Sequence, residues 1–339
     1  MRVSVIVPCR NEAAHIADFL DSALAQRLPA DCTLQLVVAD GASDDDTRLL
    51  LDRRAALEPR LVVIANPARI TSAALNRAIE CAEGEIVVRM DVHTVYAEDY
   101  VAACVATLQR TGAACVGGAW LPVGEGGRQR AIARAFSSPF GSGGAASRRP
   151  DLEGEVDTVY LGAWWRAELL RLGGFDEALV RNQDDELALR IVRGGGRVWQ
   201  SASIRSWYTP RGSFLALFRQ FWQYGYWKVA VIRKHRLPAS PRHLVPFAFV
   251  ALLASLLAAG LIWPLAWRVA GGLTAAYALA ALAGAAALDK PWQAPLQWAG
   301  IAWATACMHF GYGLGFARGL WDFSITGHAP GAGATRLTR

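Results

Sequence analysis

The chain has 339 residues, which is enough for one large domain or two ordinary ones. Hydrophobic residues make up 53% and charged residues only 19%, so part of the chain should be unusually apolar. The net charge of +6 is mild and the Arg and Lys residues are scattered, which argues against a nucleic-acid partner and fits an anionic membrane surface better. None of the six cysteines lies in a C-x-x-C pair, which argues against zinc and thioredoxin-like sites.

The first 210 or so residues alternate short apolar runs with amphipathic stretches. Strands are expected at 3–7, 34–39, 61–65 and 86–90, with helices at 13–25, 47–57 and 72–81. Strands separated by helices predict an α/β fold with a mostly parallel sheet covered on both faces. Ligands of such sheets bind beyond the carboxyl ends of the strands. The polar segments 8–12, 40–41 and 91–93 all follow strands, so we expect them to share one crevice.

Two of these segments have the chemistry of a nucleotide site. The Asp40 carboxylate can accept a hydrogen bond from a uracil ring or from ribose hydroxyls, and Gly41 lets the backbone approach a ligand closely. The segment from Pro8 through Asn11 to Glu12 supplies a second wall and another carboxylate. Asp-Gly is also common in ordinary turns, so a structural role stays open.

Asp91 and His93 form the second cluster, spaced so that both side chains point to one side of an extended chain. Diphosphate binding needs countercharge, and a divalent cation can bridge its oxygens and stabilise a leaving group. Asp is a ligand for Mg²⁺ or Mn²⁺, and His shifts the preference towards Mn²⁺. The alternative is a helix cap followed by a histidine that faces solvent.

Three consecutive acids, Asp184, Asp185 and Glu186, open an expected helix. Acids favour helix N-termini electrostatically, which gives them an ordinary structural explanation. One of them can instead deprotonate an acceptor hydroxyl as it attacks a sugar's anomeric carbon. A single base without a protein nucleophile predicts inversion at that carbon. Trp164 and Trp165 precede the acids and are candidates for stacking on an acceptor sugar, with a core role equally open for one of them.

The C-terminal part is much more apolar. The stretches 244–265, 269–288 and 294–317 are each close to the length that spans a bilayer, so we expect about three transmembrane helices within 243–319 and a flexible tail at 320–339. The glycines of the third stretch weaken its expected helix. An aromatic, amphipathic segment at 213–242 is expected in the membrane interface. Its basic residues at 233–236, and the absence of a signal peptide, predict a cytoplasmic catalytic head on a multi-pass inner-membrane protein.

The segments VSVIVPCRNE, VADGASDDDT, RMDVHT and GGFDEALVRNQDDELALR together resemble the family 2 inverting glycosyltransferases, and most closely the bacterial membrane glucosyltransferases of succinoglycan and exopolysaccharide assembly. The resemblance implies a GT-A nucleotide-sugar-binding domain at 1–212. It implies Asp184 as catalytic base, with Asp185 and Glu186 as rivals, and a Mn²⁺ or Mg²⁺ site at Asp91 and His93, where His93 replaces the family's second Asp. The residues that it places at the nucleotide are Pro8, Asn11, Glu12, Asp40, Gly41, Ser43, Asn66 and Asn76.

The expected function is transfer of a hexose, glucose from UDP-glucose, to a lipid-linked saccharide. The family's processive members carry a Gln-x-x-Arg-Trp motif, which Gln220 and Gln223 match only in part. A glutamine cannot clamp a phosphate as Arg does, although Lys228 can supply charge. We therefore favour single addition over a processive polysaccharide synthase. A catalytically silent nucleotide-sugar-binding membrane scaffold is the other alternative.

Overall fold

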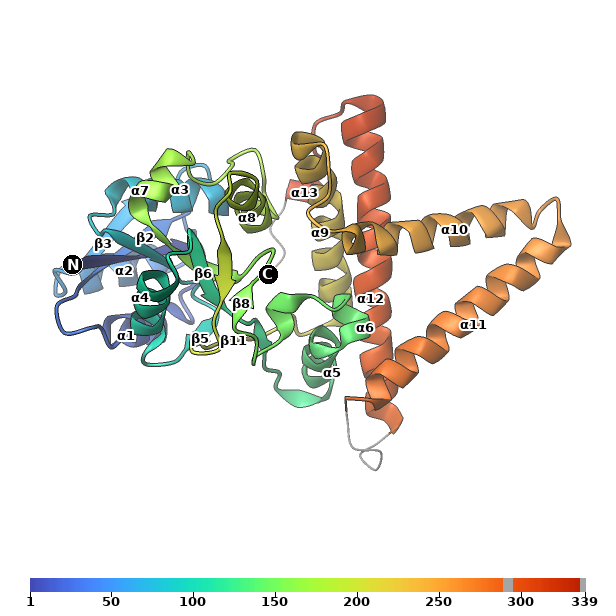
Figure 1. The fold of residues 1–339 in the computed structure, drawn as a ribbon, viewed down its shortest axis with the longest axis horizontal. Helices are drawn as coiled ribbons and strands as arrows, with labels where there is room; N and C mark the ends of the chain where they lie inside the picture. The colour runs from blue at the N-terminus through green and yellow to red at the C-terminus, as the bar shows by residue number, and fades with distance from the viewer. Residues whose placement is uncertain (289–294, 336–339) are drawn as a thin grey trace. The chain divides into compact units, whose positions relative to one another are not determined.

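The computed structural model describes residues 1–288 and 295–335. The positions 289–294 of the expected membrane region and 336–339 of the expected tail lie outside the described residues. The chain divides into two compact units (Figure 1). The first contains Met1–Leu121 and Arg149–Tyr208, and the second contains Pro122–Arg148 and Thr209–Arg339. The boundaries expected at residues 212, 242 and 319 stay predictions.

The first unit is built on an eight-stranded sheet with the order β3-β2-β1-β4-β9-β6-β10-β8. Strands β1 to β4 are mutually parallel where they pair, and β6 is parallel to β10. The four strands expected from the sequence all form, within one or two residues of the expected ends. The strands are β1 (Arg2–Cys9), β2 (Thr33–Asp40), β3 (Leu61–Ala65), β4 (Ile86–Arg89), β6 (Cys115–Gly118), β8 (Gly154–Glu155), β9 (Tyr160–Trp165) and β10 (Val198–Gln200).

Strand β9 runs antiparallel to both of its neighbours, β4 and β6. Its last residue, Trp165, lies opposite Ile86 at the start of β4, and its first residue, Tyr160, lies opposite Gly118 at the end of β6. The beginning of β9 therefore belongs to the edge where the parallel strands end, and its end belongs to the opposite edge. The sheet is thus mostly, but not wholly, parallel.

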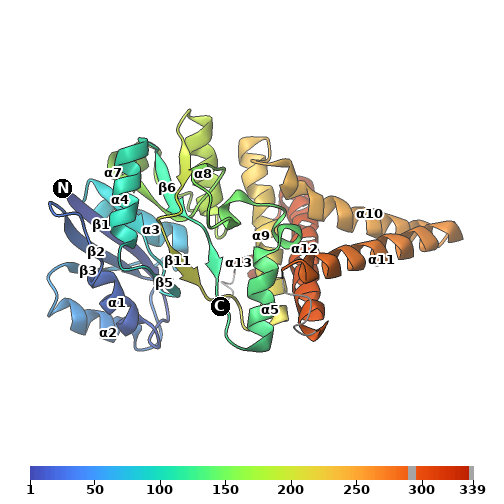
Figure 2. The ribbon, with the colours of Figure 1, turned by 60° about the horizontal axis from the view of Figure 1, so that its bottom comes forward.

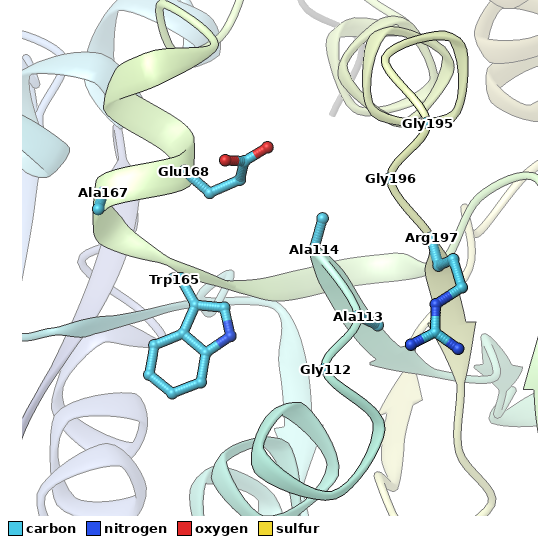
Figure 3. Close-up of a pocket in the computed structure, with 9 residues that line it drawn as sticks. All are labelled: Gly112, Ala113, Ala114, Trp165, Ala167, Glu168, Gly195, Gly196 and Arg197. Atoms are coloured by element: carbon cyan, nitrogen blue, oxygen red, sulfur yellow. The ribbon is translucent and has the colours of Figure 1, made fainter.

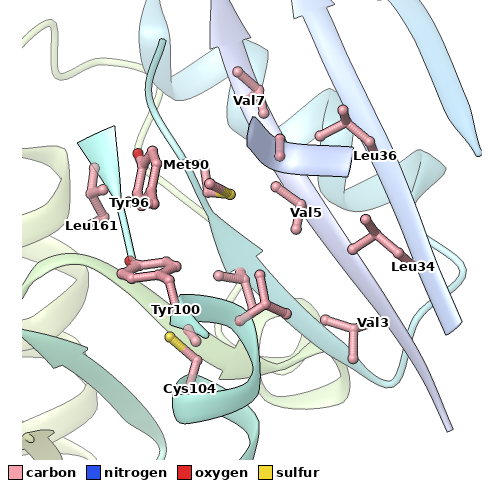
Figure 4. Close-up of a cluster of buried hydrophobic side chains, with 14 of the residues drawn as sticks. Val3, Val5, Val7, Leu34, Leu36, Met90, Tyr96, Tyr100, Cys104 and Leu161 are labelled. Carbon is pink, nitrogen blue, oxygen red and sulfur yellow. The ribbon is translucent and has the colours of Figure 1, made fainter. Parts of the chain in front are cut away.

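Helices cover both faces of this sheet because side chains along each strand alternate between two cores. Val3, Val5 and Val7 of β1 belong to one buried cluster, part of which is drawn in Figure 4, whereas Ile6 belongs to the other. The first cluster packs α1 (Ile16–Leu24), α2 (Thr47–Ala55) and α4 (Tyr100–Thr111), and the second packs α3 (Thr71–Cys81), α7 (Arg166–Arg171) and α8 (Gln183–Arg193). The expected α/β architecture, a mostly parallel sheet covered on both faces, is confirmed.

A small second sheet adjoins the segment that follows β4. Strand β11 (Ser206–Tyr208) lies in the middle, between β5 (Thr94–Tyr96) and β7 (Leu121–Pro122). Tyr208 is opposite Thr94 in the antiparallel β5–β11 pair. This sheet therefore holds the end of the first unit beside the residues that follow Asp91.

The second unit is helical (Figure 2). Its most extensive helix–helix contact is between α9 and α12. Helices α10 and α11 form a hairpin, and the base of this hairpin packs on α12 through the ring pairs Phe247–Phe316 and Phe249–Phe310. The helices are α5 (Gly126–Ser137), α6 (Pro139–Ser142), η1 (Ala146–Arg148), α9 (Phe214–His235), η2 (Pro241–Leu244), α10 (Val245–Ala259), α11 (Pro264–Ala286), α12 (Pro295–Leu320), the π-helix η3 (Trp321–Thr326) and α13 (Ala332–Thr335).

Glycines of α12 allow its close contact with α9. A Cβ atom at Gly311, Gly315 or Gly319 would lie 1.9–2.6 Å from the backbone carbonyl oxygens of α9 residues, a distance at which no side chain fits. Small residues at this spacing let two helix backbones approach closely. Gly311 and Gly315 were expected to weaken this helix, but α12 is continuous from Pro295 to Leu320 and uses them in its contact with α9.

Two described helices are long and apolar enough to cross a membrane, namely Pro241–Ala259 and Pro264–Ala286. Their side chains are largely exposed, and at the turn between them Leu261 and Ile262 are 81% and 92% exposed. Helix α12 does not meet the same criterion, so the third expected span is not found among the described residues.

Candidate functional site

The loops after β1 and β2 form one polar network. Asp40 ends β2 and is buried, and its Oδ1 accepts hydrogen bonds from the Ser43 hydroxyl at 2.6 Å and the Ser43 amide at 3.3 Å. The Ser43 hydroxyl in turn accepts from the amide of Asn11 at 2.8 Å. The Asn11 side chain exchanges hydrogen bonds with Asp44, which holds Asn11 in a left-handed backbone conformation with φ of 52°. The structure therefore brings the segments around Asn11 and Asp40 together as the sequence predicted.

Pro8 and Gly41 belong to the same place. Pro8 lies in β1 opposite Ala39, one residue before the Cys9–Asp40 pair. The Gly41 amide donates to the Cys9 carbonyl at 2.7 Å, so the backbone crosses directly over the end of β1.

Glu12 links this network to the third motif. Its carboxylate is buried, and Oε1 lies 2.8 Å from Nε2 of His93. The Glu12 amide donates to the Thr47 hydroxyl at 2.6 Å, which anchors the loop on the N-terminus of α2. Its other oxygen, Oε2, is buried and has no hydrogen-bond partner among the described residues. An acceptor left in this state is costly unless a ligand or water satisfies it.

Asn66 has the same property beside Asp40. Its amide donates to the Asp40 carbonyl at 2.7 Å, and its side-chain nitrogen donates to the Ile70 carbonyl at 3.0 Å. Its Oδ1 is buried without a hydrogen-bond partner within the described part of the chain. Two buried oxygens, Glu12 Oε2 and Asn66 Oδ1, thus lie on either side of Asp40 and lack a hydrogen-bond donor among the described residues.

Asn76 has a different environment. Its Oδ1 accepts from the Phe175 amide at 2.7 Å, and its side-chain nitrogen donates to the Phe175 carbonyl at 2.8 Å. A Cβ at Gly174, whose φ is +67°, would lie 2.4 Å from Asn76 Oδ1, so this turn requires glycine. The side chain that was expected near the nucleotide therefore holds the turn before α8.

Asp91 is bound by an arginine that the sequence analysis did not single out. Arg89, the last residue of β4, donates from Nε and Nη2 to the two carboxylate oxygens of Asp91, both at 3.0 Å. Burial alone would lower the pKa of Arg89, but the charge and hydrogen bonds of Asp91 outweigh burial and raise that pKa further above its ordinary value. The charge of Asp184 acts in the same direction, which places Asp184 within electrostatic range of this pair. The signal for this partner in the sequence was Arg89 itself, because a charged residue at the end of a buried apolar strand needs a partner of opposite charge.

The three acids at the start of α8 have different surroundings. Glu186 is fully buried and its carboxylate pairs with Arg190, whose guanidinium also donates to the Leu172 and Gly174 carbonyls at 2.6 and 2.7 Å. Asp184 and Asp185 are half-buried, and Asp184 Oδ1 accepts from the Asp185 amide at 3.0 Å. Glu186 is thus paired inside the core, whereas Asp184 and Asp185 are the more accessible of the three candidates for the catalytic base.

The two tryptophans do not lie at this site. Trp164 is 3% exposed and packs edge-on against Phe175 inside the second core. Trp165 ends β9 at the edge opposite Asp91 and lines a pocket of about 450 Å³ there with glycines 112, 195 and 196 (Figure 3). Because β9 runs antiparallel, it carries both tryptophans away from the strand ends that hold the other motifs. Trp164 thus has the core role that was the alternative, and nothing in the structure supports an acceptor role for either residue.

Gln220, Gln223 and Lys228 all lie in α9 of the second unit and are buried there. Gln220 donates to the Tyr224 hydroxyl at 2.9 Å and Gln223 to the Gly333 carbonyl at 3.0 Å. Their expected role near a phosphate stays a prediction.

A divalent cation at Asp91 and His93 would have one carboxylate and one imidazole as protein ligands. Among the described residues, no three His, Cys, Asp or Glu side chains come together as a metal site. The two side chains are nevertheless accessible, 30% for Asp91 and 46% for His93. Cations of phosphate-transfer sites take one or two carboxylates, substrate phosphates and water, so the donor set fits a cation completed by a diphosphate.

The chain is similar to several known proteins. Residues 4–165 match the family described as Glycosyl transferase family 2. The chain is 32% identical over 330 residues to the succinoglycan biosynthesis protein ExoA of Rhizobium meliloti (strain 1021), covering 94% of this chain and 95% of the relative. It is 26% identical over 275 residues, 77% and 82% of the two chains, to the dolichyl N-acetyl-alpha-D-glucosaminyl phosphate 3-beta-D-2,3-diacetamido-2,3-dideoxy-beta-D-glucuronosyltransferase of Methanococcus voltae.

Solved structures show the same fold. The mannosyltransferase PcManGT from Pyrobaculum calidifontis, in complex with GDP-Man and Mn²⁺, superimposes with a TM-score of 0.59 at 25% identity and covers 95% of this chain and 87% of that one. TarS of S. aureus matches with a TM-score of 0.51 at 18% identity over 74% of this chain and 43% of that one, and this likeness supports the fold alone. The family match and the 32% identity over nearly the whole chain show that the chain belongs to glycosyl transferase family 2.

Proposed function

We propose that this protein is an inverting hexosyltransferase that moves glucose from UDP-glucose to a lipid-linked saccharide during cell-surface polysaccharide synthesis. The observation that carries the nucleotide part is the pair of buried acceptors, Glu12 Oε2 and Asn66 Oδ1, that lack partners within the described residues on either side of Asp40. Ribose hydroxyls and the uracil N3–H are donors that would satisfy them and the Asp40 carboxylate. The succinoglycan relative supports a role in polysaccharide assembly.

The order of the strands supports the placement of the donor. Asp40 ends β2, and Asp91 follows β4 two strands away, which corresponds to about 10 Å along the carboxyl edge of the sheet. A nucleoside bound at Asp40 would therefore extend its diphosphate towards Asp91 and His93. These two residues would hold a divalent cation, which supplies positive charge to the diphosphate leaving group when it is bound.

The chain's own residues account for the remaining steps. Arg89 holds the Asp91 carboxylate by two hydrogen bonds, and Glu12 holds the His93 ring, so both side chains are oriented in advance. The proposed base, Asp184, takes the proton of an acceptor hydroxyl as that oxygen bonds to the anomeric carbon. The bond from this carbon to the diphosphate oxygen breaks on the opposite side, and UDP leaves. One displacement of this kind inverts the anomeric configuration.

The hairpin of α10 and α11 supports a membrane-bound acceptor. Its exposed apolar side chains have no described core to cover, and a bilayer would bury them. The name of the Methanococcus voltae relative also describes transfer to a dolichyl phosphate-linked sugar. We therefore infer that the protein sits in the inner membrane with its catalytic unit on the cytoplasmic side, where the basic residues Arg233, Lys234 and Arg236 precede the hairpin.

A donor screen tests this function. The full-length protein in lipid nanodiscs is given UDP- and GDP-sugars and a lipid extract of the source cells, with Mn²⁺, Mg²⁺ or EDTA, and nucleotide release is followed. Release of UDP from UDP-glucose, dependent on the extract, is expected, with one sugar added per acceptor. Binding of UDP without release for any donor would identify a silent scaffold, and a ladder of long products would identify a processive synthase.

A further inference from the structure

Three aromatic rings of the first unit gather at the carboxyl edge of the large sheet. Trp120 follows β6, Tyr160 begins β9 and Tyr208 ends β11. Trp120 stacks on Tyr160 with ring centroids 5.3 Å apart and planes 8° from parallel. Tyr208 meets both rings edge-on, at 4.9 Å from Trp120 and 6.3 Å from Tyr160. We call these three residues the aromatic platform.

The aromatic platform is tied to the residues that follow Asp91. The Tyr160 hydroxyl lies 2.8 Å from the Thr94 hydroxyl, and Tyr208 is opposite Thr94 in the β5–β11 pair. The Thr94 amide donates to the Asp91 carbonyl at 3.1 Å. Thr94 therefore connects the rings to Asp91, which belongs to the proposed leaving-group site.

These rings lie outside the two buried clusters of the first unit. Neither Trp120 nor Tyr208 belongs to the two buried clusters found in the described chain, and Tyr160 only borders the first of them. All three side chains are partly exposed, in contrast to the buried Trp164. A rigid, partly exposed group of rings keeps aromatic surface that a ligand can still bury.

We propose that the aromatic platform is the acceptor subsite, on which a pyranose ring of the acceptor saccharide stacks. This inference rests on the proposed function. A pyranose presents C–H bonds on one face, and this face packs against an aromatic ring.

The strand order distinguishes the acceptor from the nucleotide as the occupant. From Asp40 at β2, the sheet passes β1, β4 and β9 before it reaches β6 and Trp120. Trp120 is thus about two strand spacings, or about 10 Å, beyond Asp91 on the side away from Asp40. A base at Asp40 and a diphosphate at Asp91 leave the platform for the sugar that receives the transferred residue.

The test uses the full-length protein in nanodiscs and compares Trp120→Ala and Trp120→Phe with the matched control Trp165→Ala at the opposite edge of the sheet. The amount of lipid extract that half-saturates transfer is measured at saturating UDP-glucose, and UDP alone is the probe of the nucleotide site. We expect Trp120→Ala to raise the half-saturating amount about 10-fold or more and Trp120→Phe to raise it less. UDP affinity should be unchanged in both, and Trp165→Ala should resemble the wild type in both measurements.

The other outcomes separate the failures. A loss of UDP affinity in Trp120→Ala without a change in acceptor half-saturation would overturn the inference and make the platform a base-stacking site. Unchanged values for both, in Trp120→Ala and in Trp120→Phe, would also overturn it and leave the rings with packing alone. If the wild type binds UDP but transfers nothing to the extract, the proposed function fails, and the acceptor subsite fails with it.

Discussion

Glu186→Gln removes one charge from a buried ion pair at the start of α8. The Glu186 side chain is fully buried and that of Arg190 is 20% exposed, and Arg190 also supports the turn before α8 through the Leu172 and Gly174 carbonyls. Breaking a buried pair costs about 3–5 kcal/mol. Because Arg190 is partly solvated and glutamine keeps one acceptor, we expect about 2–3 kcal/mol.

For a domain of this size, that loss lowers the melting temperature by about 5–10 °C. The assay is thermal unfolding of the full-length protein, followed by near-ultraviolet circular dichroism or by tryptophan fluorescence, together with sugar transfer measured well below the transition. Asp184→Asn is the matched control, since Asp184 is half-buried and its loss should leave the melting temperature nearly unchanged. A Glu186→Gln variant that melts like the wild type but has lost transfer would refute the structural assignment of Glu186 and make it the better candidate for the base.

Three further predictions follow from other parts of the molecule. Gly315→Ala should destabilise the second unit by about 1–3 kcal/mol, because its Cβ would lie 1.9 Å from the Trp222 carbonyl oxygen, whereas Gly271→Ala on α11, which faces open space, should be neutral or stabilising in the same melting experiment. Asn76→Ala should lower stability by about 1–3 kcal/mol and leave UDP affinity unchanged in calorimetry, since its amide serves the Phe175 backbone; a large loss of UDP affinity at unchanged stability would restore the nucleotide role. Burial would raise the pKa of Glu153, but hydrogen bonds from Arg110, Trp199, Ser201 and Ala202 outweigh it and lower that pKa to about 2. Its contribution to stability is therefore complete above the unfolded-state pKa near 4.5 and disappears as the pH falls towards 2, so the difference in melting temperature between wild type and Glu153→Gln should shrink over this range, and a constant difference would contradict the reasoning.

The first half of the catalytic unit could be read from the sequence because its pattern is local. The run Leu61–Ala65 forms β3 with the expected bounds, and the loops after β1 and β2 meet because parallel strands end at one edge. Hydrophobic periodicity and strand order suffice for this conclusion.

The later half could not be read in the same way. A strand's direction depends on its long-range partners, so the antiparallel insertion of β9 left no signal around Trp164 and Trp165. The same reversal places Tyr160 at the edge of the sheet where the parallel strands end, and this position could not be predicted from the sequence around it.

The sequence pattern also does not determine in which direction a side chain points or which helices pack against each other. Spacing alone does not say which of three adjacent acids points into the core. In the structure, full burial and the contact with Arg190 separate Glu186 from its neighbours. The glycines of α12 weaken an isolated helix, and they become useful only when α9 packs against them. Arg89 was overlooked because the apolar pattern of a buried strand does not indicate what a single arginine within it binds. The structure shows that its partner is Asp91.

The most direct test of the central claim is the rate of sugar transfer by Asp184→Asn, measured beside UDP binding by the same protein. The account predicts that transfer falls by about 100-fold or more, because the acceptor hydroxyl loses its base, while UDP affinity stays within about 2-fold of the wild type. Asp185→Asn, which changes the neighbouring acid, should retain most of the activity. Undiminished transfer by Asp184→Asn would contradict the account.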